Sequence, residues 1–381
     1  MMEYKRLGDY IREVNVRNRD EMVTKLVGLT IDKAFIPSVA NVIGTDLSNY
    51  KVIGREQFAC SLMQVSRDGK MPVAMFEEDE AIMSPAYPMF EVIDKTALLP
   101  QYLMMWFSRS EFDREASYYA VGGVRGSLTW EDFCNMRLPL PSIERQREIV
   151  NEYETLSRRI SLNEQMIQNL EATAQTLYRK MFVDGIDKEN LPDGWRMGTI
   201  EELAEFVVAG VIPNYVEEDE YKVLGQRCVH DHIIDMSFVK SHIPKSNCLF
   251  VQDGDILINS TGSGTLGRVG QIITAPKNLA FDSNMTLVRP KAEYAIDYLG
   301  LAIFEKENYF VQISQGSTNQ TRLYCSMVKP AELLIPSIDE LEKFKLYVHP
   351  TRNDMELRRS ENSKLKELQS LLLAKMGNIK Q

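Results

Sequence analysis

Leu138-Pro139-Leu140-Pro141-Ser142-Ile143 recurs in this chain as Leu333-Leu334-Ile335-Pro336-Ser337-Ile338. The two stretches are 195 residues apart, and the register holds without a gap as far as Met181 and Met376. The match also extends toward the N-terminus of each copy. Leu128 aligns with Leu323, and Tyr102-Leu103 aligns with Tyr298-Leu299 after a shift of one residue. An ungapped register over a whole segment indicates an internal repeat rather than a chance motif.

Each copy of the motif is followed by a segment that predicts a long helix. Pro141 and Ser142 mark a helix start, and Glu144 and Glu148 suit the positive end of the helix dipole. Apolar residues then recur at alternating spacings of four and three, which is typical of a coiled-coil seam. The seam of the first helix is Ile149, Tyr153, Leu156, Ile160, Asn163, Ile167, Leu170, Ala174, Leu177 and Met181.

The second predicted helix is less regular. Its equivalent positions are Phe344, Val348, Thr351, Met355, Arg358, Asn362, Leu365, Gln369, Leu372 and Met376. Pro350 lies inside it and disfavours helical geometry at His349, so we expect a kink or a break there. If the helices pair antiparallel, the polar seam residues Asn163 and Asn362 come close together. The alternative is that both asparagines are exposed.

The repeat divides the chain into alternating globular and helical parts. Short apolar runs such as Asp255–Asn259 and Val269–Ile273, separated by turn residues, predict strands in mixed α/β units. Gly, Pro and Asp cluster between Asp184 and Trp195, which is typical of a linker. We therefore predict a mixed α+β fold with two repeated domains, 1–140 and 196–335, a linker at 184–195, and two long helices, 141–183 and 336–381, that form an antiparallel coiled coil with a pseudo-two-fold axis.

Composition narrows the class of protein. Hydrophobic residues make up 44% of the 381 residues and charged residues 26%, as in an ordinary globular protein. No apolar run is long enough to span a membrane and no signal-peptide core is visible, so we expect a cytoplasmic protein without a membrane partner. The five cysteines are dispersed and fit reduced thiols. A net charge of −10 predicts that the chain alone binds DNA weakly, because phosphate neutralisation dominates non-specific affinity.

Several motifs resemble catalytic or ligand sites but lack the required context. Gly262–Gly267 matches G-x-G-x-x-G, yet Arg268–Ile272 alternates like a strand, so a polar hairpin is the better interpretation than a dinucleotide loop. Cys228, His230, His232 and His242 do not have the usual spacing of zinc ligands, and a polar loop is the simpler interpretation. G-x-S-x-G and H-E-x-x-H are absent, and so is the Pro-Pro-aromatic tetrapeptide of amino-methyltransferases. We therefore predict a non-enzymatic chain with no catalytic residues, no bound cofactor and no metal.

Polar loops remain as the candidate functional sites. Arg, Asn, Gln, Ser and Thr are the residues that make bidentate or adaptable contacts to base edges. Two such loops, 122–127 and 316–322, occupy the same place in the two repeats. The candidate DNA-contacting residues are Arg17, Asn18, Arg19, Arg67, Lys70, Arg125, Ser127, Asn259, Ser260, Thr261, Ser263, Arg268, Asn319, Gln320 and Arg322, with Thr265 beside them. Each of these residues alone also fits an ordinary surface position.

The order of these motifs resembles the specificity subunit of type I restriction-modification systems. The resemblance covers essentially the whole chain: Leu138–Ile143, the helix end Leu177-Tyr178-Arg179-Lys180-Met181-Phe182, the segment Leu191-Pro192-Asp193-Gly194-Trp195, and then the same order again. Phe250–Ile258 with Thr261-Gly262 is similar to a recurrent stretch of the family's recognition domains. Pro350 and the degraded second seam depart from a uniform coiled coil.

The resemblance implies a function and a set of partners. Each recognition domain would read one half of a split target in double-stranded DNA. The helices would act as a spacer and dock two methyltransferase subunits, which carry S-adenosylmethionine and methylate adenine, and motor-nuclease restriction subunits would join for cleavage. Two rival hypotheses remain: a coiled-coil scaffold without DNA reading, and a fused methyltransferase-nuclease, which would need a catalytic motif in this chain.

Overall fold

The chain forms two compact units in the computed structural model, which describes residues 4–38, 46–63, 65–121, 126–246, 248–316 and 321–378. The first unit combines Met1–Ser161 with Asn362–Gln381, and the second unit is Leu162–Glu361. The first unit is therefore built from two separate stretches of chain, whereas the second is built from one.

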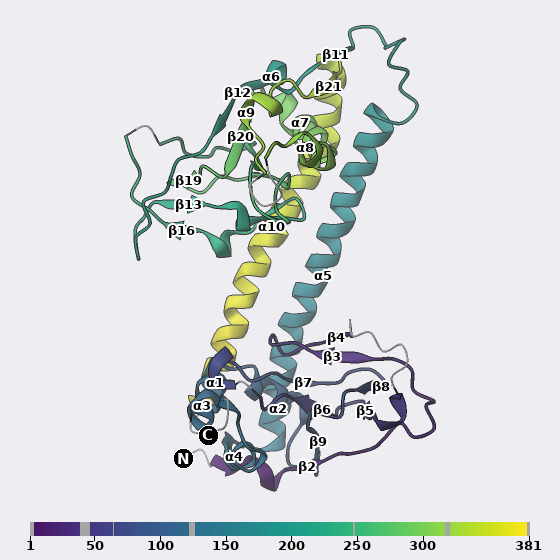
Figure 1. The fold of residues 1–381 in the computed structure, drawn as a ribbon, viewed down its shortest axis with the longest axis vertical. Coiled ribbons are helices and arrows are strands. Elements are labelled where there is room, and N and C mark those ends of the chain that lie inside the picture. Colours follow the sequence, from purple (N-terminus) through teal and green to yellow (C-terminus); the bar gives the residue numbers. More distant parts are fainter. Residues whose placement is uncertain are drawn as a thin grey trace. The chain divides into compact units, whose positions relative to one another are not determined.

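Two long helices, α5 (Ile143–Phe182) and α10 (Ile338–Lys375), each contribute one end to each unit (Figure 1). In the first unit, Gln369 Nε2 donates to Ser157 Oγ at 2.7 Å, and Asn362 Nδ2 donates to the Ile160 carbonyl at 3.3 Å. In the second unit, Phe344 near the start of α10 packs on Phe182 at the end of α5, with ring centroids 5.0 Å apart. Rising residue numbers on α5 meet falling numbers on α10, so the helices pair antiparallel within each unit, as predicted.

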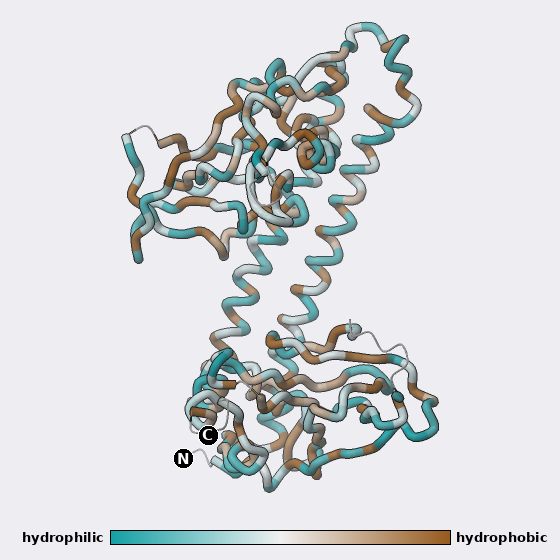
Figure 2. Tube along the Cα trace, in the orientation of Figure 1, coloured by the Kyte–Doolittle hydropathy of each residue, from teal (hydrophilic) through white to brown (hydrophobic). Residues whose placement is uncertain are grey.

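The predicted seam is the buried side of both helices. Each seam position from Ile149 to Met181 is buried or partly buried, and so is each equivalent position from Phe344 to Met376. Figure 2 shows hydrophobic residues recurring between hydrophilic ones along both helices. The heptad pattern therefore identified the packed face correctly.

Asn163 and Asn362 are buried, so the expectation that they are exposed is wrong. Asn163 is 1% exposed and Asn362 is 6% exposed. In the second unit, Asn163 Nδ2 donates to Glu361 Oε2 at 2.9 Å, and its Oδ1 accepts from Arg358 Nη1 at 3.2 Å. The amide is thus satisfied by charged partners on α10, which offsets the cost of burying it in an apolar seam.

Helix α10 continues through Pro350 without a break, so the break that was expected there as an alternative to a kink is wrong. Proline removes the hydrogen bond to the carbonyl of Leu346, which lies on the exposed side of the helix, since Leu346 is 72% exposed. Two neighbours of Pro350 contact the same buried carboxylate of Asp297: His349 Nδ1 at 3.2 Å and Arg352 Nη1 at 3.4 Å. These tertiary contacts hold the helix on both sides of the proline.

The first unit is a mixed α/β body. A four-stranded antiparallel sheet has the order β2-β9-β6-β7, and three two-stranded sheets are β1-β10, β3-β4 and β5-β8. Its strands are β1 Tyr4–Arg6, β2 Ile11–Glu13, β3 Val27–Leu29, β4 Phe35–Pro37, β5 Lys51–Gly54, β6 Phe58–Cys60, β7 Val73–Met75, β8 Glu80–Met83, β9 Met89–Val92 and β10 Arg137–Pro139. Its short helices are α1 Val65–Asp68, α2 Pro100–Phe107, α3 Ser110–Ala120 and α4 Trp130–Asn135, with 3-10 turns η1 Leu7–Asp9, η2 Leu47–Asn49 and η7 Met376–Asn378.

The second unit has the same class of fold. Its sheets have the orders β12-β20-β17-β18, β16-β13-β19, β14-β15 and β11-β21. Its strands are β11 Arg196–Thr199, β12 Ala204–Ala209, β13 Lys222–Leu224, β14 Val229–His230, β15 Ile233–Ile234, β16 Lys240–Ser241, β17 Ile256–Asn259, β18 Val269–Gln271, β19 Leu279–Phe281, β20 Met285–Pro290 and β21 Glu332–Ile335. Its short helices are α6 Ile200–Leu203, α7 Ile296–Phe304, α8 Glu307–Ile313 and α9 Cys325–Val328, with 3-10 turns η4 Gln226–Cys228, η5 Met236–Phe238 and η6 Glu293–Ala295.

The internal repeat is visible in the sheets. The order β2-β9-β6-β7 in the first unit corresponds strand for strand to β12-β20-β17-β18 in the second. In both units a two-stranded sheet joins the first strand of the unit to the strand before the long helix, as β1-β10 and as β11-β21. The strands expected at 255–259 and 269–273 are β17 and β18.

Each unit has its own apolar core. In the first unit Phe58, Phe90, Phe107 and Phe133 pack together, with Phe58 stacked on Phe90 at 5.1 Å. In the second unit the core gathers the end of α5 and the start of α10 around Tyr298. Within the described residues, no helix is both long and apolar enough to cross a membrane.

Candidate nucleic-acid interface

Two of the predicted polar loops meet in the second unit. The backbone N–H of Leu323 donates to the carbonyl of Ser260 at 2.9 Å. Beside it, Arg322 Nη2 donates to the carbonyl of Ser283 at 2.9 Å, and its guanidinium lies over the ring of Tyr324 at 5.7 Å. The connection between β17 and β18 and the segment that follows residue 320 therefore form one surface.

The first unit repeats this arrangement. The backbone N–H of Leu128 donates to the carbonyl of Leu62 at 2.8 Å. Leu62 lies in the connection between β6 and β7, which also contains α1 (Figure 1). Gly126 has a φ of 71°, and a Cβ there would lie 2.1 Å from Ser66 Oγ, so the loop approaches this connection as closely as only glycine allows. Arg67 and Lys70 thus lie in the same connection that Ser127 approaches.

A hydrogen-bond network supports the surface of the second unit. Thr261 Oγ1 contacts both Gln226 Oε1 and Asn284 Oδ1 at 3.1 Å. The backbone N–H of Asn284 in turn donates to Asp282 Oδ1 at 2.8 Å. Burial raises the pKa of the Asp282 carboxyl, although hydrogen bonds from Asn284 act in the opposite direction. This network fixes the loop that begins at residue 260.

The predicted contact residues differ in exposure. Arg19, Arg67, Lys70 and Ser263 are exposed, and Arg17, Ser127, Thr261, Thr265, Arg268 and Arg322 are partly exposed. Arg125, Asn319 and Gln320 lie outside the described residues. The exposed and partly exposed side chains remain candidates for base or phosphate contacts.

Three of the predicted residues are buried, and the structure gives them internal roles. Asn18 is 1% exposed, and its amide bonds to the backbone of Val23 in both directions. Asn259 Nδ2 donates to the carbonyl of Gln226 at 2.9 Å, while its Oδ1 is buried with no hydrogen-bond partner among the described residues. Ser260 Oγ pairs with Thr286 Oγ1 at 2.7 Å. These three side chains make internal contacts that hold their loops in place.

Arg17, Asn18 and Arg19 occupy a different connection from the other first-unit candidates. Arg17 Nη1 donates to the carbonyl of Asn49 at 2.6 Å, and the backbone N–H of Asn18 donates to Tyr50 at 2.9 Å. The segment after β2 is therefore anchored next to the start of β5. No contact in the described residues joins these three to Arg67 or Lys70.

Sequence reasoning missed Gln226, Asn284 and Thr286. Gln226 lies two residues after β13, and Asn284 directly precedes β20, so both stand near strand ends beside the predicted loop. A signal was present, because Asp282-Ser283-Asn284 is a polar turn between two apolar runs. Which polar strand ends meet in space depends on the sheet order, which local patterns do not reveal.

Two of the candidate cations already have acidic neighbours. Arg67 Nε lies 2.7 Å from Asp68 Oδ1, and Lys70 Nζ lies 3.3 Å from Asp32 Oδ1. These exposed pairs contribute little to stability and can exchange for phosphate contacts. Together with the net charge of −10, they limit the attraction that this chain alone exerts on DNA.

The two other motifs considered as ligand sites have ordinary places in the fold. Gly262–Gly267 joins the antiparallel strands β17 and β18, as the hairpin interpretation predicts. His230 Nε2 lies 3.3 Å from Asp235 Oδ2, whereas His232 contacts Glu171, so the two histidines face different partners. His242 is 1% exposed. Among the residues that the structure describes, no group of three His, Cys, Asp or Glu side chains is arranged to hold a metal ion.

Comparison with known proteins finds a curated relative by sequence and a solved structure of similar fold. The type I restriction enzyme HindI specificity subunit of Haemophilus influenzae is 28% identical over 151 residues, which are 36% of this chain and 33% of the relative. The match thus spans about a third of that protein's length. The crystal structure of a type I restriction-modification S subunit from M. genitalium has a TM-score of 0.61 and 12% identity, and the alignment covers 99% of this chain and 96% of that one. No family model matches the sequence.

The two comparisons agree with each other and with the motif order. The curated relative resembles this chain in sequence over part of its length, and the solved structure resembles it in fold over nearly all of it. The resemblance predicted from the repeated motifs is confirmed: this chain is similar to the specificity subunits of type I restriction-modification systems.

Proposed function

We propose that this chain is the DNA-sequence-reading subunit of a type I restriction-modification enzyme and that each unit reads one half of a bipartite target. The observation that carries the proposal is the shared loop junction. The bond from Leu128 to Leu62 and the bond from Leu323 to Ser260 bring two polar loops together at the same place in both repeats. A scaffold without DNA function would not require such a paired arrangement.

The chemistry of the two surfaces suits base reading in the major groove. The second surface offers Arg322, Arg268 and Gln226, and the first offers Arg67 and Lys70. Arginine pairs with guanine, and glutamine pairs with adenine, through two hydrogen bonds at a time. Different side chains at equivalent places would give the two halves of the target different sequences.

The acidic charge of the chain supports a dependence on partner subunits. Phosphate contacts supply most of the affinity of DNA-binding proteins, and a chain with a net charge of −10 has few to offer. We propose that two methyltransferase subunits supply those contacts, bind S-adenosylmethionine and methylate adenine. Restriction subunits would join this assembly to cleave DNA in the cytoplasm. The chain itself would contribute recognition and no catalysis.

The test is a map of methylated adenines in host DNA with and without this gene. The expected result is a methylated motif of two short half-targets, separated by an unread gap, that disappears when the gene is deleted. An identical methylation pattern in both strains would contradict the proposal and favour the scaffold. Exchange of residues 196–335 for the equivalent segment of another specificity subunit should then alter one half-target and leave the other unchanged.

A further inference from the structure

Each unit carries one short hairpin between corresponding strands of its four-stranded sheet. The β3-β4 hairpin lies between β2 and β6, and the β14-β15 hairpin lies between β12 and β17. Both hairpins turn through residues with left-handed backbone: Lys33 has a φ of 63° and His232 a φ of 60°. Non-glycine residues are uncommon in this conformation, and they occur there when the surrounding contacts hold them.

Lys33 extends from its hairpin into the body of the first unit. Its ammonium lies 2.9 Å from Asp113 Oδ1 and donates to the carbonyl of Phe107. It also lies 5.0 Å from the centre of the Phe112 ring. The Lys33 side chain is only 9% exposed, so this is a buried ion pair. Phe107 ends α2, and Phe112 and Asp113 belong to α3, so the hairpin is fixed at the junction of these two helices.

His232 contacts the equivalent junction in the second unit. Its ring stacks on Phe304 with centroids 4.4 Å apart and planes 4° apart. Its Nδ1 lies 3.0 Å from Glu171 Oε1 on α5, and its Nε2 lies 3.8 Å from Glu307 Oε1. Phe304 ends α7 and Glu307 begins α8. In each unit a different residue therefore anchors the hairpin turn to a pair of helices, α2 and α3 in the first unit and α7 and α8 in the second.

Both anchored hairpins also support the candidate reading surfaces. In the first unit, Asp113 accepts from the backbone N–H of Met71 at 3.1 Å, at the end of the β6-β7 connection. In the second unit, the β14-β15 hairpin packs closely on β18, since a Cβ on Gly270 would lie 2.5 Å from Ile234 Cδ1. Strand β18 begins directly after Arg268, and the 3-10 turn η4, which contains Gln226, directly precedes β14. A shift of either hairpin would move its reading surface.

We infer that Lys33 and His232 are positioning residues for the two reading surfaces, and that reading of the second half-target varies with pH through His232. This inference rests on the proposed function. Neither residue acts by contacting a base, because Lys33 is buried in the body of its unit and His232 faces α5 and α7. The two halves of the target should therefore respond differently to pH.

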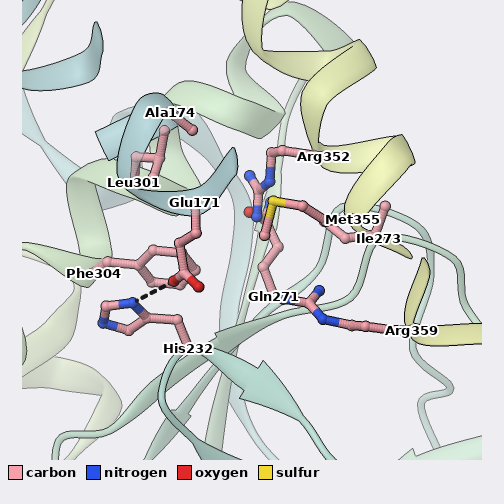
Figure 3. A pocket seen from close by; sticks show the side chains of 10 residues that line it. All are labelled: Glu171, Ala174, His232, Gln271, Ile273, Leu301, Phe304, Arg352, Met355 and Arg359. Atoms are coloured by element: carbon pink, nitrogen blue, oxygen red, sulfur yellow. Dashed lines mark hydrogen bonds and ion pairs between the residues drawn. The ribbon is translucent and has the colours of Figure 1, made fainter. Parts of the chain in front are cut away.

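Several charged groups face His232. His232 and Glu171 line a cavity of about 20 Å³, and Arg352 and Arg359 of α10 are among its other lining residues. Figure 3 shows these side chains and the contact between His232 and Glu171. The acidic groups around the ring come from four elements: Glu171 of α5, Glu305 after α7, Glu307 of α8 and Asp231 of its own turn.

The balance of these groups sets the direction of the pH effect. Burial lowers the pKa of His232, but the hydrogen bond to Glu171 and the charges of Glu307, Glu171 and Asp231 outweigh it, so the pKa is raised. A raised pKa means that the anchoring contribution is complete below the ordinary value of about 6.5 and is lost as pH rises through the raised value. Attachment of the second hairpin should weaken on the alkaline side.

The test measures binding of the assembled enzyme to duplexes carrying the motif found by methylation mapping. Two altered duplexes each have one half-target scrambled, and the ratio of dissociation constants gives the discrimination for each half. Wild-type discrimination for the second half should fall by about three- to tenfold between pH 6 and pH 8.5, while that for the first half stays constant. The substitution His232→Gln should start at the lower value and show no pH dependence.

Two further variants separate positioning from loss of fold. Glu171→Gln leaves the hairpin sequence intact and should move the pH profile of the second half toward lower pH. His230→Gln is the matched control, because His230 lies in the same hairpin and pairs with Asp235. It should keep the wild-type profile. Lys33→Met should lower discrimination for the first half only.

The outcomes distinguish the inference from the proposed function. If the wild-type enzyme discriminates neither half-target, the proposed function fails. If it discriminates both, but His232→Gln and Glu171→Gln keep the wild-type pH profile, the function stands and the inference is overturned. Should His232→Gln fail to fold, Glu171→Gln alone decides the matter.

Discussion

Tyr102 and Tyr298 make the same hydrogen bond in the two units. The hydroxyl of Tyr102 donates to the carbonyl of Pro139 at 3.0 Å, and the hydroxyl of Tyr298 donates to the carbonyl of Leu334. Both tyrosines are fully buried on the helix after the four-stranded sheet, and both carbonyls belong to the strand before a long helix. The repeat thus extends to a buried polar contact that fixes the long helix to its unit.

Removal of either hydroxyl should destabilise one unit. Tyr102→Phe and Tyr298→Phe keep the ring but leave a buried carbonyl without its partner, at a cost of about 1–3 kcal/mol each. Hydrogen exchange on the full chain resolves the effect by unit: protection should fall in the first unit for Tyr102→Phe and in the second for Tyr298→Phe. Equal loss in both units would show that they do not unfold separately.

Arg322→Ala should weaken binding of the assembled enzyme by about 1–3 kcal/mol and relax specificity in the second half-target alone, if the guanidinium reads a base. Arg67→Ala should act on the first half-target, and we expect the same of Arg125→Ala, whose residue lies outside the described part of the chain. Lys329→Ala is the control, since Lys329 is paired with Glu201 at 2.9 Å away from the loop. Wild-type affinity and specificity in Arg322→Ala would show that this loop does not face DNA.

The contacts around Pro350 predict that loss of the buried Asp297 carboxylate destabilises the second unit much more than loss of an exposed one nearby. Asp297 is 1% exposed and Arg352 is 7% exposed, so Asp297→Ala leaves a buried guanidinium without its carboxylate. Burial already lowers the pKa of Arg352, and the loss should cost about 3–5 kcal/mol in the free energy of unfolding of the second unit.

The matched control for Asp297 lies on the same two segments of chain. Glu293 pairs with Lys345 at 2.9 Å, but the Glu293 side chain is 85% exposed. Glu293→Ala should therefore change the free energy of unfolding far less than Asp297→Ala, because water screens an exposed ion pair. Comparable losses in the two variants, measured by urea unfolding, would contradict the assignment of Asp297 as the residue that holds α10 through its proline.

His242 should make the second unit sensitive to acid. Both ring nitrogens are buried with no hydrogen-bond partner among the described residues, and burial lowers the pKa of this histidine. A lowered pKa means that the unfolded chain binds the proton first, so stability is lost as pH falls below about 6.5. His242→Leu should raise the thermal midpoint at pH 5.5 more than at pH 8. A uniform change at both pH values would exclude this explanation.

The purified chain should neither transfer a methyl group from S-adenosylmethionine to DNA nor cut DNA. This expectation follows from the absence in the sequence of the catalytic motifs that such reactions use. Incorporation of a labelled methyl group into DNA measures the first activity, and addition of the partner methyltransferase provides the positive control. Methylation by this chain alone would refute the expectation.

Local periodicity predicted the long helices and their packed faces. Residues such as Ile149 and Phe344 recur at the spacing that places apolar side chains on one face, and the structure buries them. The hairpin at 262–267 was also predictable, because alternation on both sides of a glycine-rich loop is local information. The sequence could not exclude a break at Pro350, because the contacts that sustain the helix there come from Asp297, which lies more than fifty residues away in the chain.

The candidate interface was predictable in outline but not in detail. Residue type and repeat position found the loops, yet they did not separate Arg322, which is partly exposed, from Asn18 and Asn259, which are buried. Burial depends on which strands become neighbours. His232 illustrates the same limit. The sequence indicated a polar loop at this position, and the contacts of the ring with Glu171 of α5 and Phe304 of α7 depend on the tertiary fold.

The division of the first unit between two stretches of chain has a consequence for synthesis. Met376 is fully buried in the core of the first unit, and the hydroxyl of Tyr4 bonds to the carbonyl of Gly377 at 3.0 Å. On the ribosome, residues 1–161 emerge long before these partners exist, whereas the second unit is one uninterrupted stretch. The second unit can therefore finish folding before the last helical segment of the first unit has been synthesised. A chaperone that shields the incomplete core of the first unit would then act on the amino-terminal half of the chain.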